Sequence, residues 1–188
     1  MSLPLSKYRL TTAQFERMAQ AGVFPEDARI ELIEGELLEM TPVGRLHVAV
    51  VNRLTRAFAQ TVVAGRALLS VQNPIHLDEN SEPQPDVVLL RPRADDYEDN
   101  VPAPSDALLI IEVADTSAEY DRGLKARLYA RSGVSEYWVV DLQAQEIVCW
   151  QQPTLAGGYQ VMMMAHKGEA LAAQLIPDVV VRVDDVLR

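Results

Sequence analysis

The stretch ALLIIEVADTSAEYDRGLKARLYARSGVSEYWVVDL, residues 107–142, carries the strongest indication of the fold. Residues 108–113 are apolar on both faces, which is typical of a strand buried inside a sheet. Residues 136–142 predict a second buried strand, and the segment between the two has apolar side chains at helical spacing up to about Arg131. A strand, a helix and a strand in succession form a βαβ unit. The two strands are therefore predicted to be parallel, with a right-handed connection.

Helical and strand-like patterns on both sides of this unit extend it into an α/β fold. Residues 11–22 predict a short capped helix, and residues 45–60 predict a second amphipathic helix. The pair Glu34-Gly35 lies at the centre of an alternating segment, residues 29–42, and predicts a β-hairpin. Further strands are predicted at 68–77, at 87–90, at 146–150 and 158–164 as a hairpin at the sheet edge, and at 176–187 as a short strand or an extended arm.

The length and composition fit one folded domain. The chain has 188 residues, of which 48% are hydrophobic and 23% are charged, and this suffices for a substantial core. We therefore expect a single α/β domain over residues 1–188, in which a mixed sheet is flanked by helices and preceded by an N-terminal helix and a β-hairpin. The loop from Arg91 to Asp106 is rich in Asp, Pro and Arg, and its length is typical of a mobile flap near a site.

The charge and the cysteine content exclude several classes of protein. The net charge of −10 argues against indiscriminate nucleic-acid binding, which depends on Lys and Arg at the phosphates, although a local basic groove stays compatible with it. Cys149 is the single cysteine, so an internal disulfide is excluded and a reducing cytoplasm is favoured. No apolar run approaches the roughly 20 residues that span a bilayer, so no membrane association is expected.

Several common catalytic motifs are absent from the sequence. With three His and one Cys, and without a CxxC or HxxxH pattern, a zinc site is not expected. The sequence also lacks a phosphate-binding glycine-rich loop and a GxSxG motif. Nucleotide-cofactor chemistry and serine-hydrolase chemistry therefore have little support.

Two carboxylates stand beside apolar strands. Glu112 lies inside the run 108–113, where an unpaired charge costs several kcal/mol or more unless a cation, a metal ion or a raised pKa compensates for it. Asp86 precedes the apolar run 87–90. Two carboxylates at the ends of neighbouring strands can share a hard cation such as Mg²⁺, which activates water and stabilises charge at a phosphate. The alternatives are a half-solvated strand end for Glu112 and an ordinary turn residue for Asp86.

Lys125 is the third candidate residue. It lies on the helix that follows Glu112, and its ammonium could stabilise a developing anion or orient the attacking water at a metal site. The alternative is an ordinary ion pair with Asp121 on a solvated helix face, which is worth a few tenths of a kcal/mol.

The stretches PDVVLL (85–90), 107–142 and ARIELIEGELLEMTP (28–42) together resemble one family over nearly the whole chain. The chain is similar to the Uma-type restriction endonuclease-like proteins of bacteria, which belong to the PD-(D/E)XK nuclease superfamily. This resemblance implies a restriction-endonuclease-like α/β core with Mg²⁺, or Mn²⁺, held by Asp86 and Glu112. The usual lysine position of the superfamily is occupied by Ala114.

The departure at Ala114 matters for the third catalytic residue that the resemblance implies. The resemblance implies that the lysine has moved to the following helix, which points to Lys125, whose stem is long and flexible enough to reach a strand end. The resemblance further implies that an acidic residue before the core, Glu34 or Glu36, completes the metal shell. His47 lies where the family often has a histidine, without an assigned role.

Two functions from different classes remain open on the sequence. The first is a metal-dependent endonuclease that hydrolyses DNA phosphodiester bonds, with Asp86, Glu112 and Lys125 as its catalytic residues. The second is a catalytically silent interaction or regulatory module on the same fold. A homodimer is expected, because nucleases that cut both strands often pair and because the exposed edge of the tail hairpin needs covering. A basic groove near Asp86 would favour nucleic acid, whereas an acidic surface would favour the silent module; the candidate groove residues are Arg45, Arg53, Arg122 and Arg127.

Overall fold

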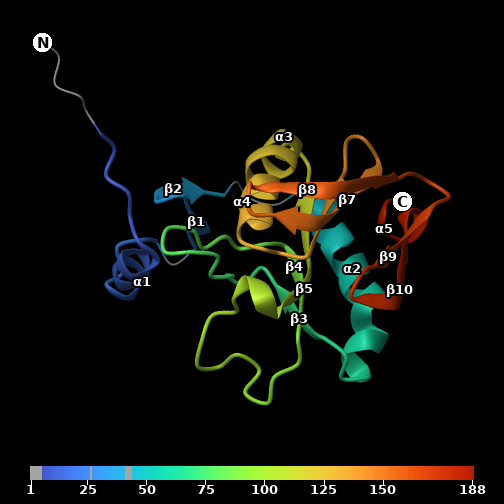
Figure 1. Cartoon of the computed structure of the whole chain (residues 1–188), viewed down its shortest axis with the longest axis horizontal. Helices are drawn as coiled ribbons and strands as arrows, with labels where there is room; N and C mark the ends of the chain where they lie inside the picture. The colour runs from blue at the N-terminus through green and yellow to red at the C-terminus, as the bar shows by residue number, and fades with distance from the viewer. Residues whose placement is uncertain (1–5, 26, 41–43) are drawn as a thin grey trace, which may run out of the picture.

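The computed structural model describes residues 6–25, 27–40 and 44–188, and its centre is a six-stranded mixed sheet with the strand order β3-β4-β5-β6-β7-β8 (Figure 1). Two further two-stranded sheets, β1-β2 and β9-β10, lie outside the central sheet. The strands are β1 (Ile30–Ile33), β2 (Glu36–Glu39), β3 (Leu68–Val71), β4 (Val87–Leu90), β5 (Ala107–Ala114), β6 (Glu136–Asp141), β7 (Glu146–Thr154), β8 (Gly158–Ala165), β9 (Ala170–Ala173) and β10 (Ile176–Arg182).

The helices are α1 (Thr12–Gln20), α2 (Arg45–Val63), the 3-10 turn η1 (Pro104–Asp106), α3 (Ala118–Tyr120), the π-helical turn η2 (Asp121–Lys125), α4 (Ala126–Arg131) and α5 (Val183–Val186). Of these, α2 and α5 contribute to the core on one face of the central sheet, and α4 contributes to the core on the other. Side chains alternate along β5, so Ile111 belongs to the same buried cluster as Leu54 of α2 and Val183 of α5, whereas Ile110 belongs to the cluster that contains Leu128 of α4. Figure 1 shows α2, β10 and α5 together on one side of the molecule.

The parallel pair predicted from residues 107–142 is confirmed. β5 and β6 run parallel, and the neighbouring strand pairs of the central sheet are antiparallel. The predicted hairpin around Glu34-Gly35 is also confirmed, with φ angles of 50° and 78° at these two residues. Two successive positive φ values are what a two-residue hairpin turn requires. The last residues of the predicted hairpin segment, 41 and 42, lie outside the described residues.

The loop from Arg91 to Asp106 lies away from the predicted site. It leaves the end of β4 at Leu90 and returns to the start of β5 at Ala107, whereas Asp86 and Glu112 lie at the opposite ends of these strands. The expectation of a flap near the site was therefore wrong. The tail also differs from an extended arm, because residues 176–182 pair with β9 and are followed by α5.

The edge hairpin predicted from the tail sequence is confirmed, since β7 and β8 pair and β8 is the last strand of the central sheet. Within the described residues, no helix combines the length and the apolar character needed to cross a membrane.

Candidate metal and phosphodiester site

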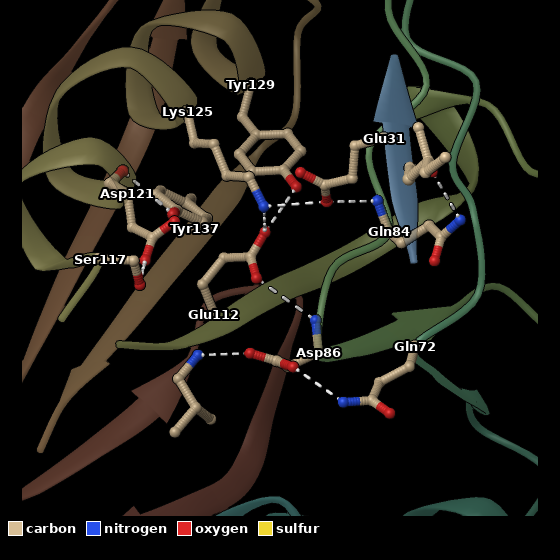
Figure 2. A network of polar contacts seen from close by, with 12 residues as sticks. Glu31, Gln72, Gln84, Asp86, Glu112, Ser117, Asp121, Lys125, Tyr129 and Tyr137 are labelled. Carbon is tan, nitrogen blue, oxygen red and sulfur yellow. Dashed lines mark hydrogen bonds and ion pairs between the residues drawn. The ribbon is translucent and has the colours of Figure 1, made fainter. Parts of the chain in front are cut away.

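Asp86 and Glu112 meet at one end of the central sheet because of the register between β4 and β5. Val87 pairs with Ile111 in this antiparallel ladder, so the preceding residue Asp86 lies opposite the following residue Glu112. The Asp86 amide donates to Glu112 Oε2 at 3.4 Å, and the Val113 amide donates to Asp86 Oδ2 at 2.9 Å. Both side chains are buried. Two carboxylates that are distant in the sequence are therefore brought side by side (Figure 2).

A cavity of about 420 Å³ lies at this end of the sheet. Its walls include Asp86 and Glu112 from the sheet, His47 from α2, and Lys125 from the π-helical turn η2. The lining is strongly acidic: its carboxylates are Glu31, Glu39, Asp86, Glu112, Asp115 and Asp121. A cavity of this size and charge is suited to a cation together with a small part of a larger ligand.

Lys125 is buried in this acidic surrounding and is held by two carboxylates. Its Nζ donates to Glu112 Oε1 at 2.8 Å and to Glu31 Oε1 at 3.0 Å (Figure 2). Burial alone would lower the pKa of Lys125, but the charges of Glu112, Glu31 and Asp121 raise it well above its usual value. The side chain is therefore a fixed cation inside the site, and the alternative of an ion pair on a solvated helix face does not fit its burial.

A π-helical turn directs Lys125 toward the sheet. The Ala126 amide donates to the carbonyl of Asp121, five residues earlier, so the helix is wider here than an α-helix. The same carbonyl accepts a hydrogen bond from the Tyr137 hydroxyl at 3.1 Å, which ties the widened turn to β6. π-turns of this kind occur frequently at functional sites. In this protein, the turn contributes both Asp121 and Lys125 to the cavity wall.

The two oxygens of Glu112 have different surroundings. Oε1 accepts from Lys125 and, at 3.0 Å, from the Tyr129 hydroxyl. Oε2 accepts the long bond from the Asp86 amide and keeps lone-pair capacity. Burial raises the pKa of Glu112 to about 8; Lys125 opposes this shift, whereas nearby acidic groups add to it. A second cation beside Oε2 would therefore favour the ionised carboxylate.

Asp86 is held on both of its oxygens. Oδ2 lies 3.0 Å from His47 Nε2 and accepts from the Val113 amide, while Oδ1 accepts from Gln72 Nε2 at 3.2 Å. Burial would raise the pKa of Asp86, but the hydrogen bond and charge of His47 and the two amide donors hold it below its usual value. The other ring nitrogen of His47, Nδ1, is buried and has no hydrogen-bond partner among the described residues. His47 thus belongs to the site through Asp86.

Two acidic residues of the β1-β2 hairpin line the cavity, Glu31 and Glu39, and Glu31 is the one that contacts Lys125. Its Oε1 accepts from Lys125 and, at 2.7 Å, from the Gln84 amide. Glu34 instead bonds Arg131 at the surface, and Glu36 bonds Lys7; neither is among the residues that line the cavity. Sequence reasoning missed Glu31 because it occupies a polar position of an alternating strand, where exposure to solvent is the ordinary expectation.

The donor atoms at Asp86 and Glu112 fit a hard divalent cation. Both residues offer carboxylate oxygens, and each has at least one oxygen that its protein partners do not saturate. Mg²⁺ commonly binds through one or two carboxylates and retains several waters. In the described part of the chain, no group of three or more His, Cys, Asp or Glu side chains is arranged around a common metal position.

The four arginines considered for a basic groove do not line the cavity. Arg122 is engaged by Asp141 at 2.6 Å and by Glu146 at 2.8 Å, and Arg53 donates to the Val186 carbonyl at 2.8 Å. Arg45 and Arg127 are exposed. The surface immediately around Asp86 is therefore acidic.

Comparisons with known proteins agree with this architecture. The family described as Uma2, putative restriction endonuclease, matches residues 12–184. A crystal structure of a putative nuclease belonging to DUF820 from Anabaena variabilis is similar, with a TM-score of 0.70 and 16% identity over 94% of this chain and 97% of that chain. The predicted α/β nuclease-like fold is thereby confirmed. No match was found among the curated proteins compared. Since the family match spans residues 12–184 of 188, the chain belongs to the Uma2 family of restriction endonuclease-like proteins.

Proposed function

We propose that this protein is a metal-dependent endonuclease that hydrolyses phosphodiester bonds of DNA. In this proposal Asp86 and Glu112 are ligands of Mg²⁺, or of Mn²⁺ in its place, and Lys125 is the cationic catalytic residue. The observation that carries it is the meeting of Asp86 and Glu112 on the wall of one cavity, with the buried ammonium of Lys125 2.8 Å from Glu112.

Each of the two carboxylates has one oxygen engaged by protein donors and a second oxygen that can bind a cation. Lys125 and Tyr129 occupy Glu112 Oε1, so Oε2 is the oxygen left for a cation. His47 and the Val113 amide occupy Asp86 Oδ2, and Oδ1 has the neutral amide of Gln72 as its partner. A bound divalent cation supplies Lewis-acid activation of water and stabilisation of charge on the phosphate.

Lys125 supports the reaction through its third N–H. An ammonium has three donors, and Glu31 and Glu112 accept two of them. The third remains for a phosphate oxygen or for the attacking water, which it would orient and whose developing charge it would stabilise. Because both carboxylates hold the ammonium, the group is fixed before the substrate arrives, and little reorganisation is needed during the reaction.

The acidic lining implies an order of binding. A polyanion is repelled by six carboxylates facing one lysine, whereas a divalent cation is attracted to them. We therefore expect DNA to bind at this cavity after the cation, and to bind weakly when the cation is removed by a chelator.

The test is the nicking of supercoiled plasmid DNA together with Mn²⁺ binding measured by electron paramagnetic resonance. The unsubstituted chain should bind Mn²⁺ and nick the plasmid, and Asp86→Asn and Glu112→Gln should lower the nicking rate by at least about 100-fold. Glu119→Gln is the matched control, because Glu119 is exposed and does not line the cavity. Absence of both activities in the unsubstituted chain, or equal rates in all variants, would contradict the proposal.

A second candidate function is a catalytically silent interaction or regulatory module. It is favoured by the acidic lining and by the position of the four arginines outside the cavity. Mn²⁺ binding without nicking of any DNA substrate would favour this second function over the first.

The homodimer is part of the same proposal, and the β7-β8 hairpin is its contact surface. β8 is an edge strand of eight residues, and Met162 and Met164 on it are 58% and 51% exposed. Residues 147–165 contain no Asp, Glu, Lys, Arg or His, although the net charge of the chain is −10. A second copy can approach this hairpin without like-charge repulsion and can pair antiparallel with the free edge. Sedimentation equilibrium should give a dimer that Met162→Lys dissociates; a monomer at high concentration would contradict it.

A further inference from the structure

Gln72 has a backbone conformation that its residue type disfavours. It directly follows β3 and has a φ of 54°, in the left-handed region where a residue with a Cβ atom is strained and glycine is not. Glycine would relieve the strain, so the glutamine at this position is expected to have a compensating use for its side chain.

The side chain of Gln72 is used to contact Asp86. Gln72 Nε2 donates to Asp86 Oδ1 at 3.2 Å, and the Gln72 backbone amide donates to the Asp86 carbonyl at 3.2 Å (Figure 2). The other two contacts to the Asp86 carboxylate, from His47 and the Val113 amide, both go to Oδ2. Within the described residues Gln72 is therefore the single protein contact that fixes Oδ1.

A neutral donor at this position is chemically suited to a carboxylate that binds a cation. An amide restricts rotation of the carboxylate without neutralising its charge, whereas a lysine or arginine would compete with a cation for the same oxygen. Groups that hold metal-binding carboxylates by hydrogen bonds typically contribute 10-fold to 100-fold to metal affinity. The orientation of Asp86 therefore explains both the left-handed backbone of Gln72 and the choice of a neutral amide side chain at this position.

We propose that Gln72 is a positioning residue that holds Asp86 Oδ1 toward a divalent cation, and that its strained backbone is retained for this contact. The role of the cation in this inference rests on the proposed function, whereas the contact between Gln72 and Asp86 is independent of that function.

The first experiment compares two glycine substitutions in the full chain. Gln145 is the matched control: its φ is 57°, its side-chain amide also donates one hydrogen bond, to the Leu142 carbonyl at 2.7 Å, and it does not line the cavity. Gln72→Gly should weaken Mn²⁺ binding by about 10-fold or more in electron paramagnetic resonance titrations. Gln145→Gly should leave the Mn²⁺ affinity unchanged, although the same strain is relieved.

The second experiment tests the contact without a metal. Melting temperatures are measured in the presence of a chelator for the unsubstituted chain, Gln72→Gly, Asp86→Ala and the double variant. Gln72→Gly removes the hydrogen bond to Asp86 in the unsubstituted chain, whereas in Asp86→Ala this hydrogen bond is already absent. The change in melting temperature caused by Gln72→Gly should therefore be more favourable in the Asp86→Ala background, by about 2 °C or more. Gln145→Gly should change the melting temperature equally in both backgrounds.

The outcomes separate this inference from the proposed function. Absence of Mn²⁺ binding by the unsubstituted chain contradicts the proposed function and the positioning role together. Mn²⁺ binding that is equally strong in Gln72→Gly and Gln145→Gly overturns the inference about Gln72 alone. Equal melting-temperature changes in the two backgrounds overturn the contact itself, whatever the metal does.

Discussion

Glu112 and Glu136 lie on the neighbouring parallel strands β5 and β6, and both are almost completely buried, at 3% and 0% exposure. They face opposite sides of the sheet. Glu112 shares its face with Ile110 and the α4 side of the core, whereas Glu136 shares its face with Trp138 and the α2 side. The two residues have the same chemistry and similar burial, so their surroundings alone decide what each can do.

The surroundings of Glu136 supply neutral donors to both of its oxygens. Its oxygens accept from Trp138 Nε1 at 2.8 Å, Gln151 Nε2 at 3.0 Å and the Gln174 amide at 2.6 Å, with the Cys149 thiol at 3.5 Å. Glu136 does not line the cavity, and it ties the segment before β10 to the sheet. Glu112 instead faces a lysine, an acidic neighbour and a cavity. The position beside a cavity, rather than burial, therefore distinguishes a candidate ligand from a structural carboxylate.

The largest expected effect tests the dependence of Glu112 on a cation. Lys125→Met removes the ammonium and leaves Glu31 and Glu112 buried without a counter-charge, so it should lower the free energy of unfolding by about 3–5 kcal/mol. Adding Glu112→Gln should recover part of this loss. Arg131→Met is the control, because the exposed pair Arg131–Glu34 contributes at most about 1 kcal/mol. Urea denaturation measures the free energy of unfolding of both variants. Equal losses in Lys125→Met and Arg131→Met would contradict a larger contribution of the buried ion pair.

The next effect separates the two glutamates by their cation affinity. Glu112→Gln should weaken Mn²⁺ binding by at least about 100-fold, equivalent to about 2.8 kcal/mol, because an amide oxygen lacks the charge of the carboxylate. Glu136→Gln should leave Mn²⁺ binding unchanged. Isothermal titration calorimetry measures the Mn²⁺ affinity of both variants. Equal affinities would contradict the difference between a metal ligand at Glu112 and a structural carboxylate at Glu136.

A smaller effect is expected from shortening Glu136. Glu136→Ala leaves the buried Trp138 Nε1 and the partly buried donors of Gln151 and Gln174 without their acceptor and should lower the free energy of unfolding by about 1–3 kcal/mol. Glu136→Gln keeps one carbonyl oxygen and should lose less. Chemical denaturation measures both variants. A stable Glu136→Ala with reduced Mn²⁺ affinity would mean that this glutamate serves the site and not the fold.

The smallest effect concerns another buried glutamate, Glu82, whose Oε2 lies 3.5 Å from His76 Nδ1. Burial raises the pKa of Glu82, and the hydrogen bond and charge of His76 offset only part of this shift. A raised pKa in the folded state favours the protonated form, so the contribution of Glu82 to stability is greatest at low pH and is lost as the pH rises through the folded-state pKa. Glu82→Gln should therefore melt higher than the parent at pH 7 and equally at pH 3.5. A lower melting temperature of the variant at pH 7 would contradict this.

The sequence predicted the central strands and the two carboxylates that meet between them. Residues 108–113 are apolar on both faces, so a buried strand and its parallel partner follow from the pattern itself. The carboxylate of Glu112 inside this run is detectable for the same reason. The hairpin turn at Glu34-Gly35 was also predictable from the sequence, because few residue pairs adopt two positive φ angles.

Other parts of the site depend on distances that no local pattern contains. Glu31 looks like the solvent-facing residue of a hairpin, and only the packing of β1 against the segment 82–84 brings it to Lys125. The π-helical turn differs from an α-helix by one residue, which apolar spacing does not resolve. Gln72 was not singled out because its role comes from a backbone angle and a contact across 14 residues.

The central claim is that one divalent cation is shared by Asp86 and Glu112. A crystal soaked in Mn²⁺ and measured for anomalous scattering tests it most directly. One strong anomalous peak is expected in the cavity, at about 2.0–2.2 Å from a carboxylate oxygen of each residue. A peak bound to one of the two carboxylates alone, or to neither, would contradict it.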